Sequence, residues 1–414
     1  MPWDEVSVDD AKVRFIEELR SGRYRMSELC SRHGISRQTG YKYRDRYAAE
    51  GVAGLAERSR APREHGRATD AELVERLLAL RRQHPTWGPK KLLAVLRRAD
   101  PEQAWPAPST GSEILRRAGL SEPRRRVRRP EPQERPFGAV SGPNDTWCVD
   151  FKGWFRTGDG RRCDPLTVTD AASRFLLGLE LVTPTGEGVW PVMMGLFREY
   201  GLPRAIRSDN GPPFASTGAG GLTRLSVCWA KLGIDLERTQ PGCPYQNGRH
   251  ERMHGTLKAE CCRPAAATPA AQQARFDAFR DEYNEQRPHE ALGQVPPGSL
   301  YQPSPRRLPD RVPEPEYGAD DLVRRVRSNG EVKWRNSLLF LSEALAGEPV
   351  GIREQADGLW LVRFAAVPVA IIDHRTNKIT RLGPGRPPRP KATTTTNQHL
   401  SAMYPDHSVS DVSG

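Results

Sequence analysis

The sequence lacks long hydrophobic runs and is poor in cysteine. No stretch of 18 apolar residues occurs in its 414 residues, so we expect no membrane-spanning helix. Seven cysteines are scattered along the chain without a C-x-x-C pair, and this odd number favours a reduced, intracellular protein over one held by disulfides. The first fifteen residues contain acids and lack an apolar centre, unlike a signal peptide, so we expect a cytoplasmic protein.

Positive charge, by contrast, is abundant. The chain has 63 lysines and arginines against 51 acidic residues, a formal net charge of +12. A basic protein of this size suggests a polyanionic partner, most often nucleic acid. Charge alone leaves open a basic housekeeping enzyme with no nucleic-acid partner. The length is sufficient for two to four domains.

Composition divides the chain into blocks. We expect helical domains at 8–60 and 66–120, an Arg/Pro-rich linker at 121–140, a mixed domain at 141–305, a strand-rich domain at 315–383 and a disordered tail at 384–414. The fold class expected is therefore multidomain, with all-α units first, an α/β domain in the centre and a small β domain last.

The segment from residue 27 to 44 has the pattern of a helix-turn-helix. Ser27 and Ser36 can each cap a helix, and His33-Gly34 between these helices suits a tight turn. The second helix of such a motif enters the DNA major groove by its amino-terminal residues. The candidate DNA contacts there are Arg37, Gln38, Thr39, Tyr41, Lys42 and Arg44. Gly40 weakens the helix prediction, and a plain helical hairpin with a solvated basic face is the alternative.

A second helical unit follows. Residues 70–84 and a segment opening at Trp87 have helical patterns, and Ser109 is placed to cap a third helix. Two tandem units followed by an Arg-rich linker favour DNA binding over a solvated basic surface, and they predict a second helix-turn-helix domain. The candidate DNA contacts in this part are Lys90, Lys91, Arg124, Arg125 and Arg126.

Residues 141–305 alternate in the order β-β-β-α-β-α-β-α, which indicates an α/β domain with a mixed sheet. Asp150 lies within the first strand, Asp209 at the end of the fourth, and Glu251 on the last helix. A helix packed across such a sheet can bring these three acids together, and the rim of a sheet is where α/β sites form.

The stretch HERMH at 250–254 also matches H-E-x-x-H, in which two histidines hold zinc and the glutamate is the general base of a metalloprotease. The following residues, GTLKAECC, provide no histidine where the longer zinc-protease pattern requires one. A third ligand from Glu282 or Glu285 is compatible with the spacing. A zinc protease has no need of DNA-binding units or of a strand-borne Asp150, which disfavours this alternative.

Three stretches, WCVDFKG, RSDNGPPFAS and YQNGRHERMHGTLK, together resemble the integrase-core transposases of bacterial insertion sequences, relatives of the retroviral integrases. The resemblance covers nearly the whole chain and implies a ribonuclease H-like central domain. It also implies that Asp150, Asp209 and Glu251 are a catalytic and metal-binding D-D-E triad. Between Asp209 and Glu251 lie 41 residues, more than in many relatives, and we expect the excess to be a surface insertion at STGAGGLTRLS.

The resemblance implies metal-dependent DNA chemistry. Three carboxylates suit two Mg²⁺ ions about 3.5–4 Å apart, which activate water or a 3′ hydroxyl and stabilise the leaving oxygen, and Mn²⁺ is expected to substitute. Neither ATP nor another small-molecule cofactor is required. The expected partners are double-stranded DNA, as the element's terminal inverted repeats and as target, and further copies of the chain. We expect a nucleoid-associated protein without a membrane partner.

Residues around the triad are expected to shape the site. An Asn-Gly pair allows a tight turn after Asp209, and a second pair begins the catalytic helix. Lys258 lies on the helix face of Glu251, so it can contact a DNA phosphate. The site-shaping candidates are Asn210, Gly211, Asn247, Gly248 and His254. No role is assigned to His250.

The last block, 315–383, alternates as five short strands, with Asn329-Gly330 as a hairpin turn, and predicts a small β-barrel. Its basic residues either bind DNA without sequence preference or form a charged surface with no ligand; they are Arg324, Arg325, Arg327 and Lys333. Besides a transposase, a DNA-binding regulator with an inactive catalytic domain remains open.

Overall fold

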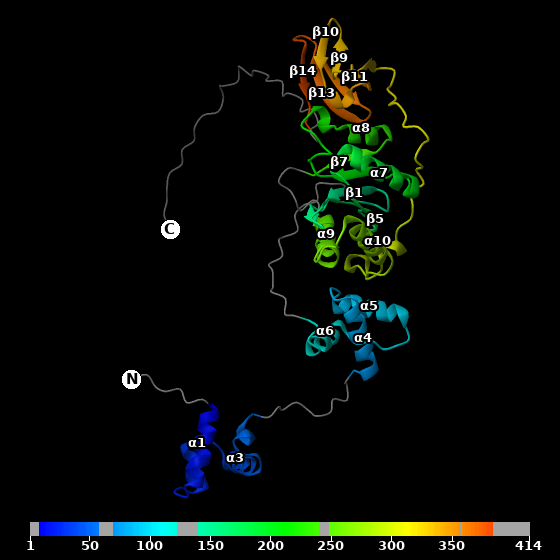
Figure 1. Cartoon of the computed structure of the whole chain (residues 1–414). Helices are drawn as coiled ribbons and strands as arrows, with labels where there is room; N and C mark the ends of the chain where they lie inside the picture. The colour runs from blue at the N-terminus through cyan, green and yellow to red at the C-terminus, as the bar shows by residue number, and fades with distance from the viewer. Residues whose placement is uncertain (1–7, 58–68, 122–139, 240–247, 357, 384–414) are drawn as a thin grey trace, which may run out of the picture. The chain divides into compact units, whose positions relative to one another are not determined.

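The computed structural model describes residues 8–57, 69–121, 140–239, 248–356 and 358–383 (Figure 1). The interior of the predicted linker and the whole predicted tail lie outside these residues. By its internal contacts the chain divides into two units, Met1–Asp70 and Ala71–Gly414, which we describe separately. No helix in the described part of the chain combines the length and the apolar character needed to cross a membrane.

The amino-terminal unit consists of α1 (Val8–Arg20), α2 (Met26–Arg32), α3 (Arg37–Glu50) and the short helix η1 (Gly51–Leu55). Ser36 caps α3, since its hydroxyl accepts a hydrogen bond from the backbone N–H of Thr39 at 3.1 Å. Phe15, Leu29 and Leu55 are buried in its small core. The predicted pair of helices joined by a turn is therefore present.

Gly40 has a packing role in addition to its expected cost in helix propensity. The residue is buried, and a Cβ atom there would lie 2.5 Å from Cys30 Sγ and 3.0 Å from Met26 Sδ. Because real Cβ atoms do not approach other atoms so closely, only glycine lets α3 pack this tightly against α2. The close approach is a tertiary contact, which helix propensity does not register.

The second unit begins with three helices: α4 (Ala71–Gln83), α5 (Pro89–Ala99) and α6 (Pro108–Arg117). They enclose a core that includes Leu77, Trp87 and Leu92. The prediction that Ser109 caps the third helix is wrong, because Ala107 is the N-cap and makes no side-chain cap bond. Pro108 occupies the first helical position, where its fixed φ and missing N–H start a helix without a polar cap.

A five-stranded mixed sheet forms the centre of the second unit, in the order β5-β4-β1-β6-β7. Its strands are β1 (Thr146–Phe151), β4 (Pro165–Asp170), β5 (Leu176–Leu181), β6 (Ala205–Ser208) and β7 (Asp235–Arg238). β1 pairs antiparallel with β4 and parallel with β6. A hairpin of β2 (Phe155–Arg156) and β3 (Arg162–Cys163) projects after β1. The antiparallel first three long strands match the prediction.

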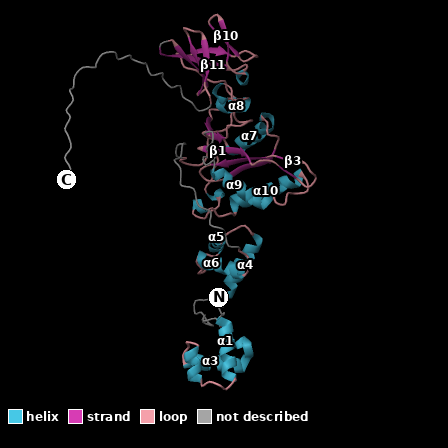
Figure 2. Cartoon of the chain, turned by 90° about the vertical axis from the view of Figure 1, so that its left-hand side faces the viewer, coloured by secondary structure: helices cyan, strands magenta, loops and turns pink. Residues whose placement is uncertain are grey.

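Helices cover both faces of this sheet (Figure 2). α7 (Gly186–Tyr200) and α8 (Arg224–Lys231) pack on one face, in a core that contains Trp147 and Val149 of β1. α9 (Gly248–Cys261) and α10 (Pro269–Glu285) pack on the other face, against Leu176 and Leu179 of β5. Two short helices follow, η4 (Glu290–Leu292) and η5 (Pro297–Ser299). Because side chains alternate along a strand, Asp150 faces the layer of α9.

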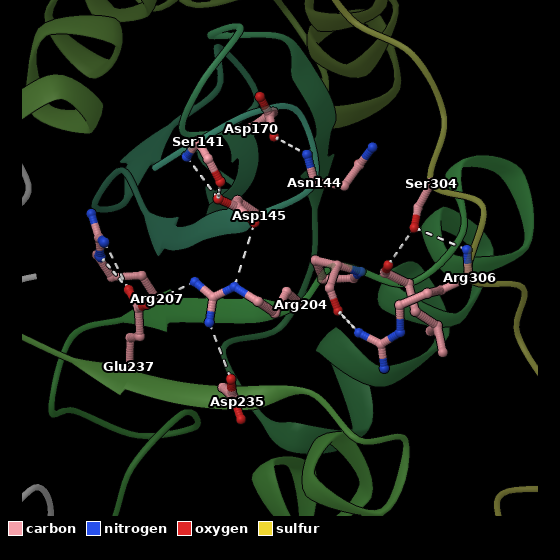
Figure 3. A network of polar contacts seen from close by, with 12 residues as sticks. Ser141, Asn144, Asp145, Asp170, Arg204, Arg207, Asp235, Glu237, Ser304 and Arg306 are labelled. Atoms are coloured by element: carbon pink, nitrogen blue, oxygen red, sulfur yellow. Dashed lines mark hydrogen bonds and ion pairs between the residues drawn. The ribbon is translucent and has the colours of Figure 1, made fainter. Parts of the chain in front are cut away.

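Ion pairs tie the parallel strands together at the end of the sheet opposite the candidate site. Arg204 lies 3.4 Å from Asp145 and 3.1 Å from Asp235, and Arg207 pairs with Glu237 at 2.7 Å (Figure 3). Arg207 and Glu237 are also direct cross-strand partners in the β6–β7 ladder. The pair with Asp145 joins the start of β6 to the start of β1, and the other two pairs join β6 to β7.

The carboxyl-terminal strands form an open sheet in the order β14-β13-β12-β11-β8, and a separate hairpin of β9 and β10. Their bounds are β8 (Leu322–Arg325), β9 (Glu331–Trp334), β10 (Ser337–Phe340), β11 (Pro349–Ala356), β12 (Leu359–Phe364), β13 (Val367–Asp373) and β14 (Lys378–Arg381), with the short helix η6 (Glu343–Leu345) after β10. Among the described residues no ladder closes this sheet, so the β-rich domain is present but a barrel is not shown.

The predicted surface insertion is not a surface feature. Within STGAGGLTRLS the short helix η2 (Ala219–Gly221) is buried in one core with the carboxyl-terminal sheet. The backbone N–H of Gly220 donates to the carbonyl of Leu382 at 2.8 Å. A Cβ atom at Gly220 would lie 2.9 Å from Cγ1 of Val369 on β13. The segment predicted as a surface insertion instead packs closely between two domains, and Gly220 allows the close approach.

Candidate active site

Two of the three predicted acids come from neighbouring parallel strands. The β1–β6 register pairs Cys148 with Arg207, and continuing it by two residues brings Asp150 beside Asp209. Adjacent strands are about 4.8 Å apart, so the two acids lie close together at the same end of the sheet. Asp150 is half-buried, whereas Asp209, one residue past the end of β6, is exposed.

The third acid belongs to the helix that covers this end of the sheet. Glu251 lies in the first turn of α9 and is exposed. Burial raises the pKa of Asp150 to about 7, and the negative charges of Asp209 and then Glu251 act in the same direction. Asp209 and Glu251 are therefore each close enough to act on the charge of Asp150, although the three acids are not among the groups whose ligand atoms all lie within 4.8 Å of one another in the described residues. Such a cluster has the oxygen-only donor chemistry that Mg²⁺ and Mn²⁺ prefer.

Two histidines of α9 form hydrogen bonds with β4, the strand that pairs with β1 beside Asp150. The hydroxyl of Thr167 on β4 donates to the backbone carbonyl of Asp150 at 2.9 Å. The same oxygen lies 2.6 Å from Nε2 of His250 and 2.8 Å from Nε2 of His254. A hydroxyl has a single proton, so both imidazoles must donate to Thr167. Thr169 completes the set, with its hydroxyl 3.1 Å from Nδ1 of His250.

The two imidazoles are neutral at pH 7. Burial, followed by the proximity of the second ionisable imidazole of His254, keeps the pKa of His250 well below its ordinary value. Burial and the nearby charge of Lys152 lower the pKa of His254 to about 4. A neutral His250 that donates from Nε2 must accept at Nδ1, which assigns the hydroxyl of Thr169 as the donor there.

The residues grouped around the two histidines differ from the ligand set that a zinc protease requires. Asp150, His250 and His254 have potential ligand atoms within 4.8 Å of one another, so these residues could hold a metal ion. Both Nε2 atoms are already engaged by Thr167, however, and an ion bound through them would break those bonds. Glu282, one of the two expected third ligands, lies 3.3 Å from His84.

The residues after Asp209 hold its carboxylate in place. The backbone N–H of Gly211 donates to Oδ1 of Asp209 at 3.3 Å, and a Cβ atom on Gly211 would lie 3.1 Å from Oδ2. The side-chain amide of Asn210 donates to the carbonyl of Thr239. Gly248 is the first residue of α9, and Asn247 lies outside the described residues.

Arg238 is a member of this site that sequence reasoning missed. Its guanidinium donates to the hydroxyl of Ser208 and to the carbonyl of Phe214. Burial lowers its pKa to about 10, and the charge of Asp209 partly offsets this effect. Arg238 thus places a positive charge close to the exposed carboxylate of Asp209. Its position at the end of β7, next to β6, was the only available signal.

Thr167 and Thr169 were missed as well, and His250 had been noted without a role. The period of two in PLTVTD places both threonines on one strand face, and the spacing of four residues places both histidines on one helix face. Each face was therefore readable in the sequence. The contact between the two faces could not be predicted from the sequence, because it depends on how α9 crosses β4.

The candidate DNA contacts lie in three different settings. In α3, Arg37, Gln38, Tyr41, Lys42 and Arg44 are exposed, and Thr39 is half-buried at the cap. On α5, Lys90 pairs with Glu290 at 2.7 Å, while burial and then Arg287 lower the pKa of Lys91 to about 8. Lys258 is exposed on α9. Arg124, Arg125 and Arg126 lie outside the described residues.

Comparisons with known protein families match residues between 11 and 297. Two family models described as an integrase core domain match residues 140–244 and 232–297. A helix-turn-helix domain matches residues 11–63, and a homeodomain-like domain matches residues 39–115. The helix-turn-helix match covers the first helical unit, the homeodomain-like match extends from α3 into α6, and the integrase-core matches cover the mixed sheet and its helices.

Two relatives come from insertion elements. The chain is 33% identical over 241 residues to an uncharacterized 39.2 kDa protein of insertion element IS476 from Xanthomonas euvesicatoria, a match that covers 55% of this chain and 64% of that relative. It is 33% identical over 234 residues to an uncharacterized 31.7 kDa protein of IS407 from Burkholderia multivorans, covering 55% of this chain and 80% of the relative. The chain thus spans less than two thirds of the first relative.

Solved structures give weaker matches. The catalytic core domain of HTLV-2 integrase in complex with magnesium is 15% identical, with a TM-score of 0.32, over 40% of this chain and 100% of that one. A simian T-cell lymphotropic virus intasome in complex with PP2A regulatory subunit B56 gamma is 16% identical, with a TM-score of 0.34, over 75% and 100%. At these TM-scores the likeness carries no further weight.

Proposed function

This chain belongs to the integrase-core transposases of bacterial insertion sequences, and from this premise we propose that it cuts and joins the ends of such an element. The helix-turn-helix units bind the terminal inverted repeats. The central domain cleaves the donor ends and transfers the strands to target DNA. Asp150, Asp209 and Glu251 are the catalytic residues.

One observation carries the proposal. The pKa of Asp150 is raised to about 7 by burial together with the charges of Asp209 and Glu251. A fold that holds a half-buried carboxylate near two other acids loses stability by doing so, unless a cation compensates. Two divalent ions fit this donor set, since Mg²⁺ takes a few carboxylates and shares its remaining positions with phosphate oxygens. When bound, such ions supply activation of the attacking oxygen and stabilisation of the leaving oxygen.

The chain's own residues position the reacting DNA. The backbone of Asp150 is fixed by the strand ladder and by Thr167, so the side chain starts from a defined point at the end of the sheet. Asp209 is oriented by the N–H of Gly211, and Glu251 is carried by a helix that His250 and His254 dock onto β4. Lys258, two turns along α9 from Glu251 and exposed, is placed to bind a phosphate of the same strand.

The DNA partners follow from the domain arrangement. The exposed first turns of α3 present arginine, glutamine and lysine side chains that suit base edges and phosphates. Transposition joins two element ends to one target, so we propose that a homo-oligomer forms on DNA. The carboxyl-terminal sheet, which shares a core with η2, helps to hold this assembly.

A strand-transfer assay on element ends with Mg²⁺ tests the proposal. Asp150→Asn, Asp209→Asn and Glu251→Gln should each lose about 10³-fold or more in rate, because each removes a charge that nothing else in the site replaces. Glu187→Gln is a matched control, since Glu187 is an exposed acid on α7, across the sheet. DNA binding should be retained in all four variants.

The same assay separates the alternative. A regulator with an inactive core would bind the repeats as tightly as a transposase but show no strand transfer in the unmodified protein. Mn²⁺ should support the reaction in place of Mg²⁺, and chelation should stop it. Equal rates in the unmodified protein and the three triad variants would sink the assignment of the catalytic residues.

A further inference from the structure

The hairpin that follows β1 exposes a large aromatic side chain close to the acid cluster. Trp154 is 56% exposed, more than any other tryptophan, tyrosine or phenylalanine that the structure describes. It lies four residues after Asp150, between β1 and β2. Four residues span at most about 14 Å, which is about the rise of four nucleotides in one DNA strand. Its indole therefore lies within a few nucleotides of a phosphate held at Asp150.

The charges around Trp154 suit a polyanion. The segment 152–164 contains four basic and two acidic residues, a net charge of +2. The guanidinium carbons of Arg162 and Arg156 lie 5.3 and 5.8 Å from the centre of the indole ring. Both distances are within cation–π range, so a base that stacks on the indole displaces one guanidinium from the ring; Arg162 is also paired with Asp164 at 2.7 Å.

The hairpin is anchored, although its tryptophan is exposed. The backbone N–H groups of Gly158 and Asp159 donate to the carbonyls of Ala266 and Ala267, both at 2.9 Å. Phe155, next to Trp154, packs edge-on against Phe276 of α10 with ring centroids 6.4 Å apart. Cys163 is buried at the other end. Trp154 is thus presented by a fixed support, which lowers the entropy lost when a ligand stacks on it.

Base stacking is the interaction that this combination favours. An exposed indole beside guanidinium groups binds a nucleobase by stacking while the cations bind the flanking phosphates. Bases within an intact duplex already stack on their neighbours, and only an unpaired base offers a free face. Strand cleavage and transfer produce strand ends, where bases can unpair.

We propose that Trp154, with Arg156 and Arg162, forms a stacking site for an unpaired base of the DNA strand whose phosphate lies at Asp150. This inference rests on the proposed function and extends it, because it names the structure of DNA that the site prefers. A duplex with an unpaired end should bind better than a blunt duplex, and the preference should depend on the indole ring.

Fluorescent DNA tests this directly with the full chain. One duplex carries a two-nucleotide overhang that contains 2-aminopurine, and a second has the same sequence fully paired. Binding is measured in EDTA, so that no cleavage follows. The protein should quench the overhang probe, and Trp154→Ala should weaken binding of the overhang duplex about tenfold, since stacking of one base is worth about 1–3 kcal/mol. Its affinity for the paired duplex should stay within twofold.

Two further variants sharpen the result. Trp154→Phe keeps an aromatic face and should keep most of the quenching. Phe340→Ala is the matched control, because Phe340 is 42% exposed with the guanidinium of Arg381 at 5.6 Å from its ring, yet belongs to the carboxyl-terminal domain. It should bind both duplexes as the unmodified protein does.

Three outcomes would overturn the inference: no loss with Trp154→Ala, an equal loss for both duplexes, or a change in oligomeric state by sedimentation without a change in DNA binding. The last outcome would assign Trp154 to a contact between copies. The binding assay needs no catalysis, so a protein without strand-transfer activity can still show the stacking. A protein that transfers strands without any dependence on Trp154 refutes only this inference.

Discussion

Thr167 donates its hydroxyl proton to the backbone carbonyl of Asp150, at 2.9 Å, across the β1–β4 ladder. This bond leaves the oxygen of Thr167 as acceptor for two imidazole N–H groups from α9. One hydroxyl therefore connects the strand that carries the buried acid to the helix that carries Glu251. The distance between the first and third members of the proposed triad depends on this connection.

Replacing Thr167 by valine should loosen the site. The substitution keeps the shape but leaves the buried N–H groups of His250 and His254 without their acceptor, which costs about 1–3 kcal/mol. The midpoint of thermal unfolding should fall. Strand transfer should fall about ten- to a hundredfold, because a small displacement of α9 misplaces Glu251.

Thr169→Val provides the control for that change. It removes a single bond, to Nδ1 of His250, and leaves the link between Asp150 and α9 intact. We expect a smaller loss of stability and nearly full strand transfer. If the two valine variants lose the same activity, Thr167 does not position the triad.

Removing the charge of Asp150 should stabilise the protein when no divalent ion is present. A raised pKa means that the folded state disfavours the ionised carboxylate, so Asp150→Asn gains stability once the pH exceeds the ordinary carboxyl value of 3.8, and the gain is complete above the folded-state pKa of about 7. The gain at pH 8 should be of order 1–4 kcal/mol, measured as a higher unfolding midpoint in EDTA.

Mg²⁺ should reverse the order of stability of the unmodified protein and Asp150→Asn. Addition of the ion should raise the unfolding midpoint of the unmodified protein and of Glu187→Gln, and it should have little effect on Asp150→Asn. A variant that is no more stable than the unmodified protein in EDTA would contradict the repulsion among the three acids. An equal response to Mg²⁺ would contradict their role as ligands.

The zinc alternative has its own measurement. The neutral imidazoles of His250 and His254 already donate to Thr167, so we expect less than one zinc per ten chains in the purified protein by elemental analysis. His254→Ala should reduce strand transfer less than Asp150→Asn does. One zinc per chain, lost in His254→Ala together with activity, would make the histidines metal ligands instead of a docking contact.

The order and type of the central elements were predictable because each has a clear period. Alternation in WCVDF identifies the strand and the face of Asp150, and the spacing of residues 250 and 254 identifies a helix face. Contacts between elements were not predictable. Gly40 was taken as a weak point and Gly220 as part of an exposed loop, although both let other elements approach closely. Secondary-structure propensity describes the preference of a residue's own backbone. At these two positions the need for glycine comes from the neighbouring elements that pack against the backbone.

Gly40→Ala tests the close approach of α3 to α2. Alanine favours a helix by up to about 1 kcal/mol, but its Cβ would lie 2.5 Å from Cys30 Sγ, an overlap that costs about 1–3 kcal/mol. Amide hydrogen exchange in α3 should therefore become faster. Gly255→Ala on α9 has no atom within 4 Å of its Cβ and should slow exchange there. Slower exchange in both would show that propensity outweighs the overlap.

Gly220→Ala should weaken the joint between the catalytic domain and the carboxyl-terminal sheet. Gly220 has φ +65°, which is unfavourable for alanine, and the added Cβ would lie 2.9 Å from Val369 Cγ1. Gly347→Ala separates the two effects, because Gly347 has φ +84° and no atom within 4 Å of its Cβ. Both variants incur the backbone strain of about 1 kcal/mol, and only the first also displaces β13. Limited proteolysis should therefore release the carboxyl-terminal domain faster from Gly220→Ala than from Gly347→Ala. Equal rates would mean that backbone strain alone accounts for the effect, and that η2 does not hold the two domains together.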